Sequence, residues 1–242
     1  MARGGADLEA AQRLRYDVFV EELGAAGACV DSDRRLETDR WDAFADHLIL
    51  REGRRDEVVG VYRLLTSEAA EAAGGYYSAG EYDLAPLVAS GRRLLELGRT
   101  CLHPDHRGGT ALSHLWAALV QYCESRGIEI LFGSASFHGT DIGALAAPMS
   151  LLHHRHLAPP DIRVRALPGS CQRMDLLDPD SIDRAAAIRQ VPALIKAYLR
   201  LGGFVGDGAF VDHAFNTTDV CLILDTARLN ERQVALYRNA TP

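Results

Sequence analysis

Three carboxylates in the first hundred residues are the leading candidates for chemistry. Glu96 lies inside a leucine-rich stretch that predicts a strand, and Asp39 and Asp42 stand three residues apart in a charged loop. A carboxylate in the interior of a strand is costly to bury unless it is paired. One interpretation pairs Glu96 with an arginine such as Arg15 or Arg63. The other is a pocket for an amine or another cationic substrate, in which one carboxylate handles the substrate's proton.

A glycine-containing loop is the second candidate, because it joins a predicted strand to the most regular predicted helix. Arg107, Gly108 and Gly109 stand directly before that helix. Free N–H groups and the helix dipole at such a position favour an anion such as a phosphate, and glycine lets the backbone approach it closely. The loop matches neither a P-loop nor a dinucleotide-binding fingerprint. A tight turn that carries a surface arginine is the alternative interpretation.

Other polar side chains give weaker signals. Ser134 and Ser136 alternate along a predicted strand and share one face, where packing is favoured over the lining of a substrate channel. The histidines of residues 153–156 lack the spacing of a closed zinc site, so we expect no metal and favour a basic patch that faces an acidic protein or lipid headgroups. Cys101 lies on a predicted strand and is expected to fill core.

Apolar periodicity predicts the elements that must position these residues. Apolar residues at spacings of three and four predict a first helix over residues 7–22, whereas residues 24–46 are expected to form a surface loop. A helix from residue 141 should be interrupted or restarted at Pro148. The order of elements gives a mixed α/β class. Strands are predicted over 47–51, 58–65, 94–102, 128–137, 208–212 and 217–225, and further helices over 111–126 and 191–201.

Composition excludes several classes of protein. The 242 residues are 48% hydrophobic and 24% charged, which is typical of a globular protein and not of a disordered or fibrous one. The net charge of -7 argues against general binding to nucleic acid. Five scattered cysteines, no secretory signal and no apolar run of membrane-spanning length predict a cytoplasmic protein with reduced thiols.

Several motifs resemble those of known acyltransferases. H-P-D-H-R-G-G, between a strand and a helix, resembles the acyl-carrier loop of the GNAT superfamily, although residues 107–111 read R-G-G-T-A and depart from the usual glycine pattern. Over the first 140 residues, the ordered pieces R-Y-D-V-F, E-T-D-R-W-D, G-V-Y-R-L-L and E-L-G-R resemble acyl-homoserine-lactone synthases. The later sequence is instead similar to that of the N-acyltransferases of the ornithine-lipid pathway, so the resemblance spans nearly the whole chain.

This resemblance implies a GNAT-type α/β fold, with a central, mostly antiparallel mixed sheet flanked by helices and a C-terminal elaboration. It implies one domain over 1–242, in which 1–140 form the acyl-transfer core and 141–242 complete the fold and the acyl site. The implied reaction transfers a 3-hydroxyacyl group from acyl carrier protein to the α-amine of L-ornithine and gives lyso-ornithine lipid. The phosphopantetheine arm of the carrier is the donor, no cofactor is bound permanently, and peripheral contact with the inner membrane surface is expected.

With this resemblance, the candidate residues take expected roles. The catalytic pair is Glu96 and Arg99. The substrate-binding set is Asp39, Asp42, Arg15, Phe19, Arg63, Ser134 and Ser136. The set that binds phosphopantetheine is Leu102, His103, Arg107, Gly108, Gly109 and Thr110.

Direct aminolysis of a thioester is the expected reaction, with Glu96 as the proton acceptor, directly or through a water. A carboxylate with its reference pKa of about 4.3 is a weak base for an ammonium group, so either burial raises that pKa or the site binds the minority neutral amine. Three rival functions stay open. They are a lactone synthase that uses S-adenosylmethionine, a non-catalytic acyl-carrier or lipid-binding protein, and an enzyme that acetylates a small amine from acetyl-CoA.

Overall fold

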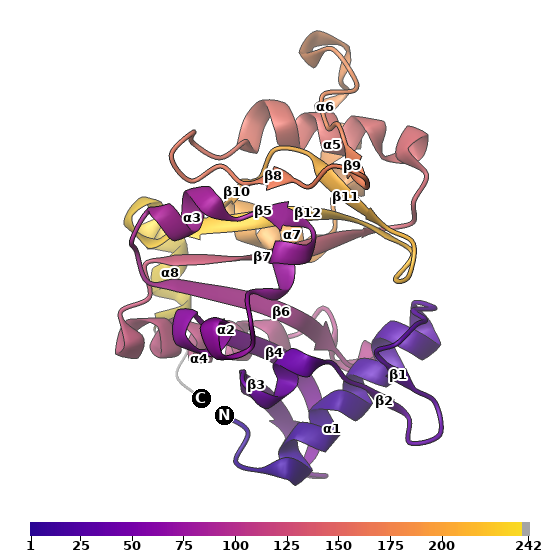
Figure 1. The fold of residues 1–242 in the computed structure, drawn as a ribbon, viewed down its shortest axis with the longest axis vertical. Helices are drawn as coiled ribbons and strands as arrows, with labels where there is room; N and C mark the ends of the chain where they lie inside the picture. Colours follow the sequence, from indigo (N-terminus) through magenta and orange to yellow (C-terminus); the bar gives the residue numbers. More distant parts are fainter. Residues whose placement is uncertain (239–242) are drawn as a thin grey trace. The chain divides into compact units, whose positions relative to one another are not determined.

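The computed structural model describes residues 1–238, and the chain divides into two compact units that interleave along the sequence (Figure 1). The first unit contains Met1–Tyr76, Leu95–Ile128 and the described residues from Arg232 onward. The second contains Tyr77–Leu94 and Glu129–Glu231. The expectation of one domain with a boundary near residue 140 stays a prediction.

The first unit is built on three antiparallel strands in the order β3 (Asp46–Glu52), β4 (Glu57–Thr66) and β6 (Leu94–Leu102). Two helices, α1 (Gly5–Arg15) and α4 (Ala111–Arg126), pack against β3 and β4. Beyond Arg15 the first helix continues as a π-helical segment, Tyr16–Glu22. The smaller elements of this unit are β1 (Val30–Asp31), β2 (Leu36–Glu37), α2 (Ser67–Ala72) and α8 (Glu231–Arg238).

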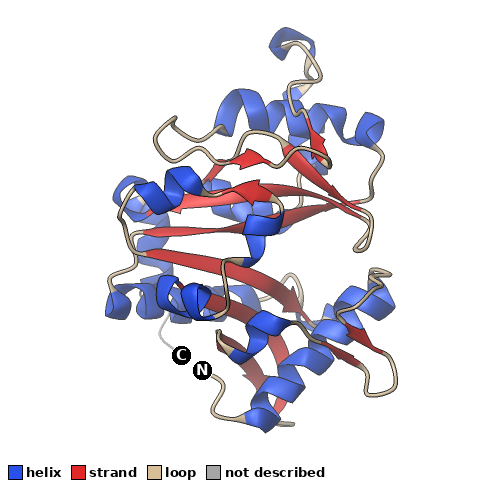
Figure 2. Cartoon of the chain, in the orientation of Figure 1, coloured by secondary structure: helices blue, strands red, loops and turns tan. Residues whose placement is uncertain are grey.

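The second unit has an antiparallel sheet at its centre (Figure 2), in which β12 (Thr217–Asp225) is buried along its whole length. On one side of β12 lies β7 (Ile130–His138), and on the other lie β11 (Ala209–Asp212) and then β9 (Cys171–Gln172). The remaining strands are β10 (Phe204–Val205), which pairs with β12, and the separate pair β5 (Tyr82–Asp83) and β8 (Arg165–Ala166). The helices are α3 (Ala85–Ala89), α5 (Ile142–His156), α6 (Arg184–Gln190) and α7 (Ala193–Arg200).

The structure confirms the mixed α/β class and corrects two of the sequence-based expectations. α5 runs through Pro148 without a break, because Pro148 and the turn of helix that follows it are buried in the core and their packing holds the helix together. Residues 24–46 are not a simple surface loop: Leu36, Glu37 and Asp42 are buried, because their side chains are anchored in the first unit. Within residues 1–238, no helix combines the length and the apolar character needed to cross a bilayer.

Candidate active site

Three arginines and three carboxylates form a closed, buried ring in the first unit. Each carboxylate accepts bonds from two arginines, and each arginine donates to two carboxylates, so three positive and three negative charges alternate. Buried charges are tolerated when every one of them is paired in this way. In bonding order, the ring consists of Arg15, Glu37, Arg99, Asp39, Arg63 and Asp42.

Arg15, at the end of α1, is fully buried. Its Nε donates to Glu37 Oε2 over 2.5 Å, and its Nη1 donates to Asp42 Oδ1 over 2.7 Å. Burial by itself lowers the pKa of the Arg15 guanidinium, but the charges of Glu37 and Asp42 outweigh it and raise that pKa. Burial likewise works to raise the pKa of Asp42, yet Arg15 and Arg63 bring it down to about 2. Both Arg15 and Asp42 therefore stay ionised at neutral pH.

A reciprocal capping interaction also holds two of the carboxylates in place. Asp39 begins a short 3-10 helix, Arg40–Ala43, and its Oδ1 accepts the N–H of Trp41 over 3.0 Å. Asp42 Oδ2 in turn accepts the N–H of Asp39 over 3.3 Å. This is a capping box, and it explains why an acid three residues after an acid is useful in this loop. Arg63 of β4 then donates to both Asp39 oxygens over 2.5 Å.

Arg99 joins the ring from an unusual backbone position. Its φ is +51°, in the left-handed region that non-glycine residues rarely adopt. At this point β4 places one residue, Tyr62, opposite Arg99 and Thr100 of β6, so the ladder contains a bulge. Arg99 donates from Nε to Glu37 Oε1 and from Nη2 to Asp39 Oδ2, both over 3.0 Å. These two bonds hold the residue in its strained conformation.

Glu96 lies on the same face of β6 as the Arg63 guanidinium of the ring. Its side chain is only 3% exposed. Strand alternation gives residues 96 and 98 the same face and turns Leu95 and Leu97 to the other. A Cβ placed at Gly98 would lie 3.5 Å from Arg63 Nη2, so the Arg63 guanidinium occupies the face that Glu96 shares. The charge of Glu96 also adds to the rise in the pKa of Tyr76 that burial mainly causes.

Five of the predicted site residues are thus bonded together in the ring, and Glu96 lies on the face of β6 that Arg63 covers. The sequence-based set omits Glu37, although an acid two residues before Asp39 in the same motif is a usable signal. Phe19 packs at the edge of an apolar cluster that includes Val61 and Cys101. The expectation that Cys101 fills core is confirmed, and burial raises the pKa of its thiol to about 12. A role for Phe19 in substrate binding stays a prediction.

The predicted anion loop follows β6. Arg107 is held by an ion pair, because its Nη1 and Nη2 donate to the two carboxylate oxygens of Glu22 over 2.6 and 2.7 Å. Gly108 has φ of +75°, and no described atom lies within 4 Å of a Cβ built at Gly108 or Gly109, so this part of the loop borders open space. Binding of phosphate here stays a prediction, and Glu22 of the π-helical segment is a neighbour that the sequence does not reveal.

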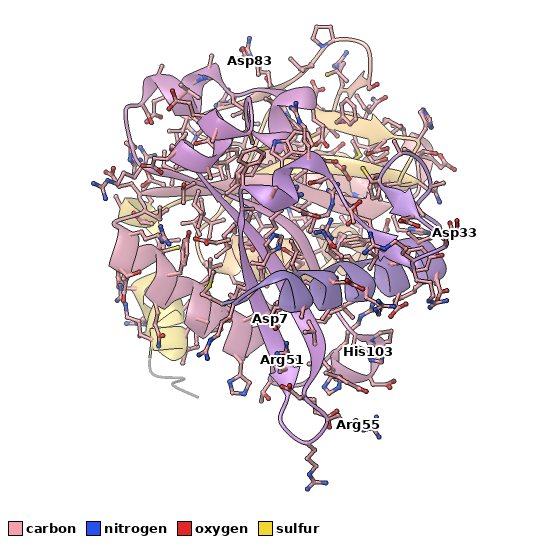
Figure 3. All side chains as sticks on the ribbon, turned by 60° about the horizontal axis from the view of Figure 1, so that its bottom comes forward. Asp7, Asp33, Arg51, Arg55, Asp83 and His103 are labelled. Atoms are coloured by element: carbon pink, nitrogen blue, oxygen red, sulfur yellow. The ribbon has the colours of Figure 1, made fainter. Side chains whose placement is uncertain are left out.

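The other members of the anion set take ordinary places in this turn. Leu102 ends β6, and its carbonyl accepts a bond from Arg107 Nε over 3.1 Å. His103 begins a 3-10 turn, and its Nδ1 accepts the N–H of Asp105 over 3.3 Å. Thr110 immediately precedes α4. Figure 3 shows His103 on the same side of the molecule as Asp7 and Arg51, which tie α1 to β3 by a 2.5 Å ion pair.

The two predicted serines belong to the second unit, on β7. Ser134 is half-buried and donates to Glu81, whereas Ser136 is exposed and stands opposite Asp219 of β12. Carboxylate oxygens of Glu81, Asp212 and Asp219 lie within 4.8 Å of one another. The sequence-based set omits these three acids, although a carboxylate inside the apolar β12 is a recognisable signal. The serines' role and the absence of a bound metal stay predictions.

Comparisons with known proteins bear on the same residues. The acetyltransferase (GNAT) domain model matches residues 14–117, which contain the whole ring. An L-ornithine N(alpha)-acyltransferase of Rhodobacter capsulatus is 55% identical over 98% of this chain and 93% of its own. The corresponding protein of Brucella abortus is 42% identical over 98% of this chain and 87% of its own.

A solved structure adds support for the fold alone. The CoA-dependent acyl-homoserine lactone synthase BjaI, with SAM and isopentyl-CoA, is 19% identical, covers 96% of this chain and 80% of its own, and has a TM-score of 0.53. The GNAT-type fold and the N-acyltransferase activity expected from the motifs are confirmed. With this fold and with relatives that match over nearly their whole length, the chain belongs to the L-ornithine N(alpha)-acyltransferase family.

Proposed function

We infer that this chain acylates the α-amine of L-ornithine with an acyl group delivered as a thioester on acyl carrier protein. The names of two relatives, at 55% and 42% identity, support L-ornithine as the acceptor and its α-amine as the acylated group. The carrier-bound donor, its 3-hydroxyacyl group and a lyso-ornithine lipid product rest on the motif resemblance. The observation that carries the proposed chemistry is the buried Glu96 on the ring's face of β6.

The reaction is an aminolysis. The α-amine nitrogen attacks the thioester carbonyl carbon, a C–N bond forms, the C–S bond breaks, and the phosphopantetheine sulfur leaves and takes up a proton as the thiol. An α-amine has an unperturbed pKa of about 8, so the neutral form is a minority at pH 7. Glu96 accepts the proton that the nitrogen loses as the C–N bond forms, directly or through a water. The loop at Gly108 and Gly109 borders open space, which supports an approach of the donor's phosphate to the backbone there.

The ring contributes rigidity to this chemistry. Asp39 and Asp42 each form ion pairs with two arginines of the ring. These contacts support a role for both acids in positioning the arginines. Direct attraction of the substrate's ammonium by Asp39 and Asp42 stays a prediction. Arg99 lies in the bulge of β6, three residues after Glu96. The ring therefore fixes the backbone of the strand that carries the proposed base.

Glu96→Gln tests the proposed base. The amide has the shape of the acid but accepts no proton, so kcat should fall about 10²- to 10⁴-fold while the variant folds normally. The assay follows thiol release from 3-hydroxyacyl carrier protein with L-ornithine, and mass spectrometry identifies the acyl-ornithine product. Glu57→Gln, an exposed glutamate at the start of β4, is the matched control and should keep the wild-type rate. Native-like turnover of Glu96→Gln would remove Glu96 from the mechanism.

The same assay separates the rival functions. An acyl-homoserine lactone formed from S-adenosylmethionine would make the chain a lactone synthase. Binding of the acyl carrier without thiol release on addition of any amino acid would make it a non-catalytic binding protein. Transfer from acetyl-CoA to a small amine, with no use of long acyl donors, would make it a small-molecule acetyltransferase.

A further inference from the structure

Two consecutive helices of the second unit, α6 and α7, carry four cations and no acidic residue. Elsewhere, arginines commonly pair with carboxylates, as Arg92 does with Asp225 and Arg173 does with Asp175. In the described chain, by contrast, no carboxylate lies within ion-pair distance of the cations that α6 and α7 carry. These cations are Arg184, Arg189, Lys196 and Arg200.

The sequence concentrates this charge. Between Asp183 and Asp207 the chain contains no acidic residue, although its net charge is -7. α6 and α7 both lie in this stretch and are joined by only two residues, Val191 and Pro192. The exposed Asp178, Asp180 and Asp183 directly precede α6, but the two helices themselves carry four cations and no acid, and such a stretch attracts a partner of opposite charge.

α7 divides its two faces cleanly. Ile195 and Tyr198 are buried, and the helix packs against β12. The opposite stripe, with the spacing i, i+3, i+4 and i+7, consists of Ala193, Lys196, Ala197 and Arg200. Two cations separated by alanines leave room for another helix to approach closely.

α6 presents a similar surface. Ala187 is buried in a cluster with Leu151 of α5, and Arg184, Ile188 and Arg189 are exposed. Ile188, at 37% exposure, is the one large apolar side chain that α6 turns outward. We call the outward residues Arg184, Ile188, Arg189, Lys196 and Arg200 the α6–α7 surface.

We propose that the α6–α7 surface is the docking site for an acidic helix of the acyl carrier protein. This inference rests on the proposed carrier-bound donor. Charge complementarity supports it, and the small residues between the cations suit a protein helix better than a bilayer. A helix that binds in a bilayer presents large apolar residues to the acyl chains. On α7, Ile195 and Tyr198 are instead buried in the fold, and Leu194 and Leu199 are half-buried.

Paired charge reversals test the surface. Arg184→Glu with Arg189→Glu and, separately, Lys196→Glu with Arg200→Glu should each raise KM for 3-hydroxyacyl carrier protein at least tenfold. Neither pair should change kcat or KM for the same acyl group on free pantetheine, which has no protein to dock. The matched control is Arg54→Glu with Arg55→Glu. These two exposed arginines lie in the β3–β4 turn, and Arg55 projects outward in Figure 3.

The outcomes separate the docking inference from the function beneath it. If the wild type transfers no acyl group from either donor, the proposed function fails. If the wild type is active but either helix pair leaves KM for the carrier-bound donor unchanged, the docking inference fails alone. Sedimentation with phosphatidylglycerol vesicles provides the last arm. Loss of vesicle binding with unchanged KM for the carrier-bound donor would overturn the inference and identify a lipid surface as the partner.

Discussion

A ring of six alternating charges leaves no member that can be removed alone. Removal of one carboxylate takes one of the two partners from each of two guanidinium groups in a site from which water is largely excluded, and such a loss costs more than an exposed ion pair contributes. Arg15 is fully buried and Asp42 is 5% exposed, so solvent does little to replace a lost partner. The ring therefore has to be treated as one structural unit.

Asp42→Asn gives a stability prediction with a defined sign. The pKa of Asp42 is about 2 in the native state, against a reference value of 3.8 for the unfolded chain. A carboxyl whose pKa falls on folding stabilises the native state above its unfolded pKa, and that contribution is lost as the pH falls through about 2. Asp42→Asn should lower the free energy of unfolding at pH 7 by on the order of 2–4 kcal/mol.

Denaturant titrations at several pH values check this prediction. The difference between wild type and Asp42→Asn should narrow as the pH falls from about 4 toward 2. Asp33→Asn is the control, because Asp33 is an exposed acid in the preceding loop, and its effect should stay within about 0.5 kcal/mol. If the difference in the free energy of unfolding were as large at pH 2 as at pH 7, the ring would not be what keeps Asp42 ionised.

The bulge between β4 and β6 couples the sheet to the ring. Arg99→Gly would relieve a left-handed backbone conformation that costs about 1–2 kcal/mol. The same substitution would remove the buried ion pairs of Arg99 with Glu37 and Asp39. We expect the second effect to dominate, with a net loss of roughly 2–4 kcal/mol in the free energy of unfolding.

Asn216→Gly isolates the backbone contribution in that experiment. Asn216 has φ of +52°, nearly the same as Arg99, and it is exposed. Its replacement by glycine should change the free energy of unfolding by no more than about 1 kcal/mol. Equal effects of the two substitutions, measured by urea denaturation, would mean that the ion pairs of Arg99 add no stability.

Local patterns predicted the elements better than the contacts among them. The stripe that ends at Gly127 identified α4, and residues 217–225, which are apolar from Val220 to Leu224, identified β12. Pro148 misled because the burial of a proline in the core is not visible from its neighbours in sequence. The partner of Arg107 could not be found either, since Glu22 is 85 residues distant and no local rule links the two. The ring was partly visible, because its acids stand together in one motif.

The uneven distribution of charge governs the behaviour of the molecule as a whole. A net charge of -7 would repel an acidic carrier, and the acid-free stretch between Asp183 and Asp207 provides the local exception. Attraction between exposed charges is screened over about 8 Å at physiological ionic strength. The KM for 3-hydroxyacyl carrier protein should therefore rise several-fold between low salt and about 0.3 M NaCl.

A protein-free donor provides the comparison for this salt dependence. The KM for 3-hydroxyacyl-pantetheine should stay nearly constant over the same range, because that donor carries no acidic helix. Parallel increases in both KM values would point to a general effect of salt on the active site. Steady-state assays of the full chain at several salt concentrations distinguish screening of carrier docking from a general effect of salt on the active site.

The Arg107–Glu22 ion pair has a consequence for discrimination among phosphates. Before any donor arrives, a carboxylate of the same chain already satisfies the guanidinium fork. A free phosphate ion would have to expel Glu22 with little besides its own charge to hold it in place. The phosphate of the proposed pantetheine-bound donor would be tethered, so other contacts would retain it while Arg107 exchanged Glu22 for the phosphate. If the loop binds the donor's phosphate as proposed, inorganic phosphate is therefore expected to compete poorly for the loop.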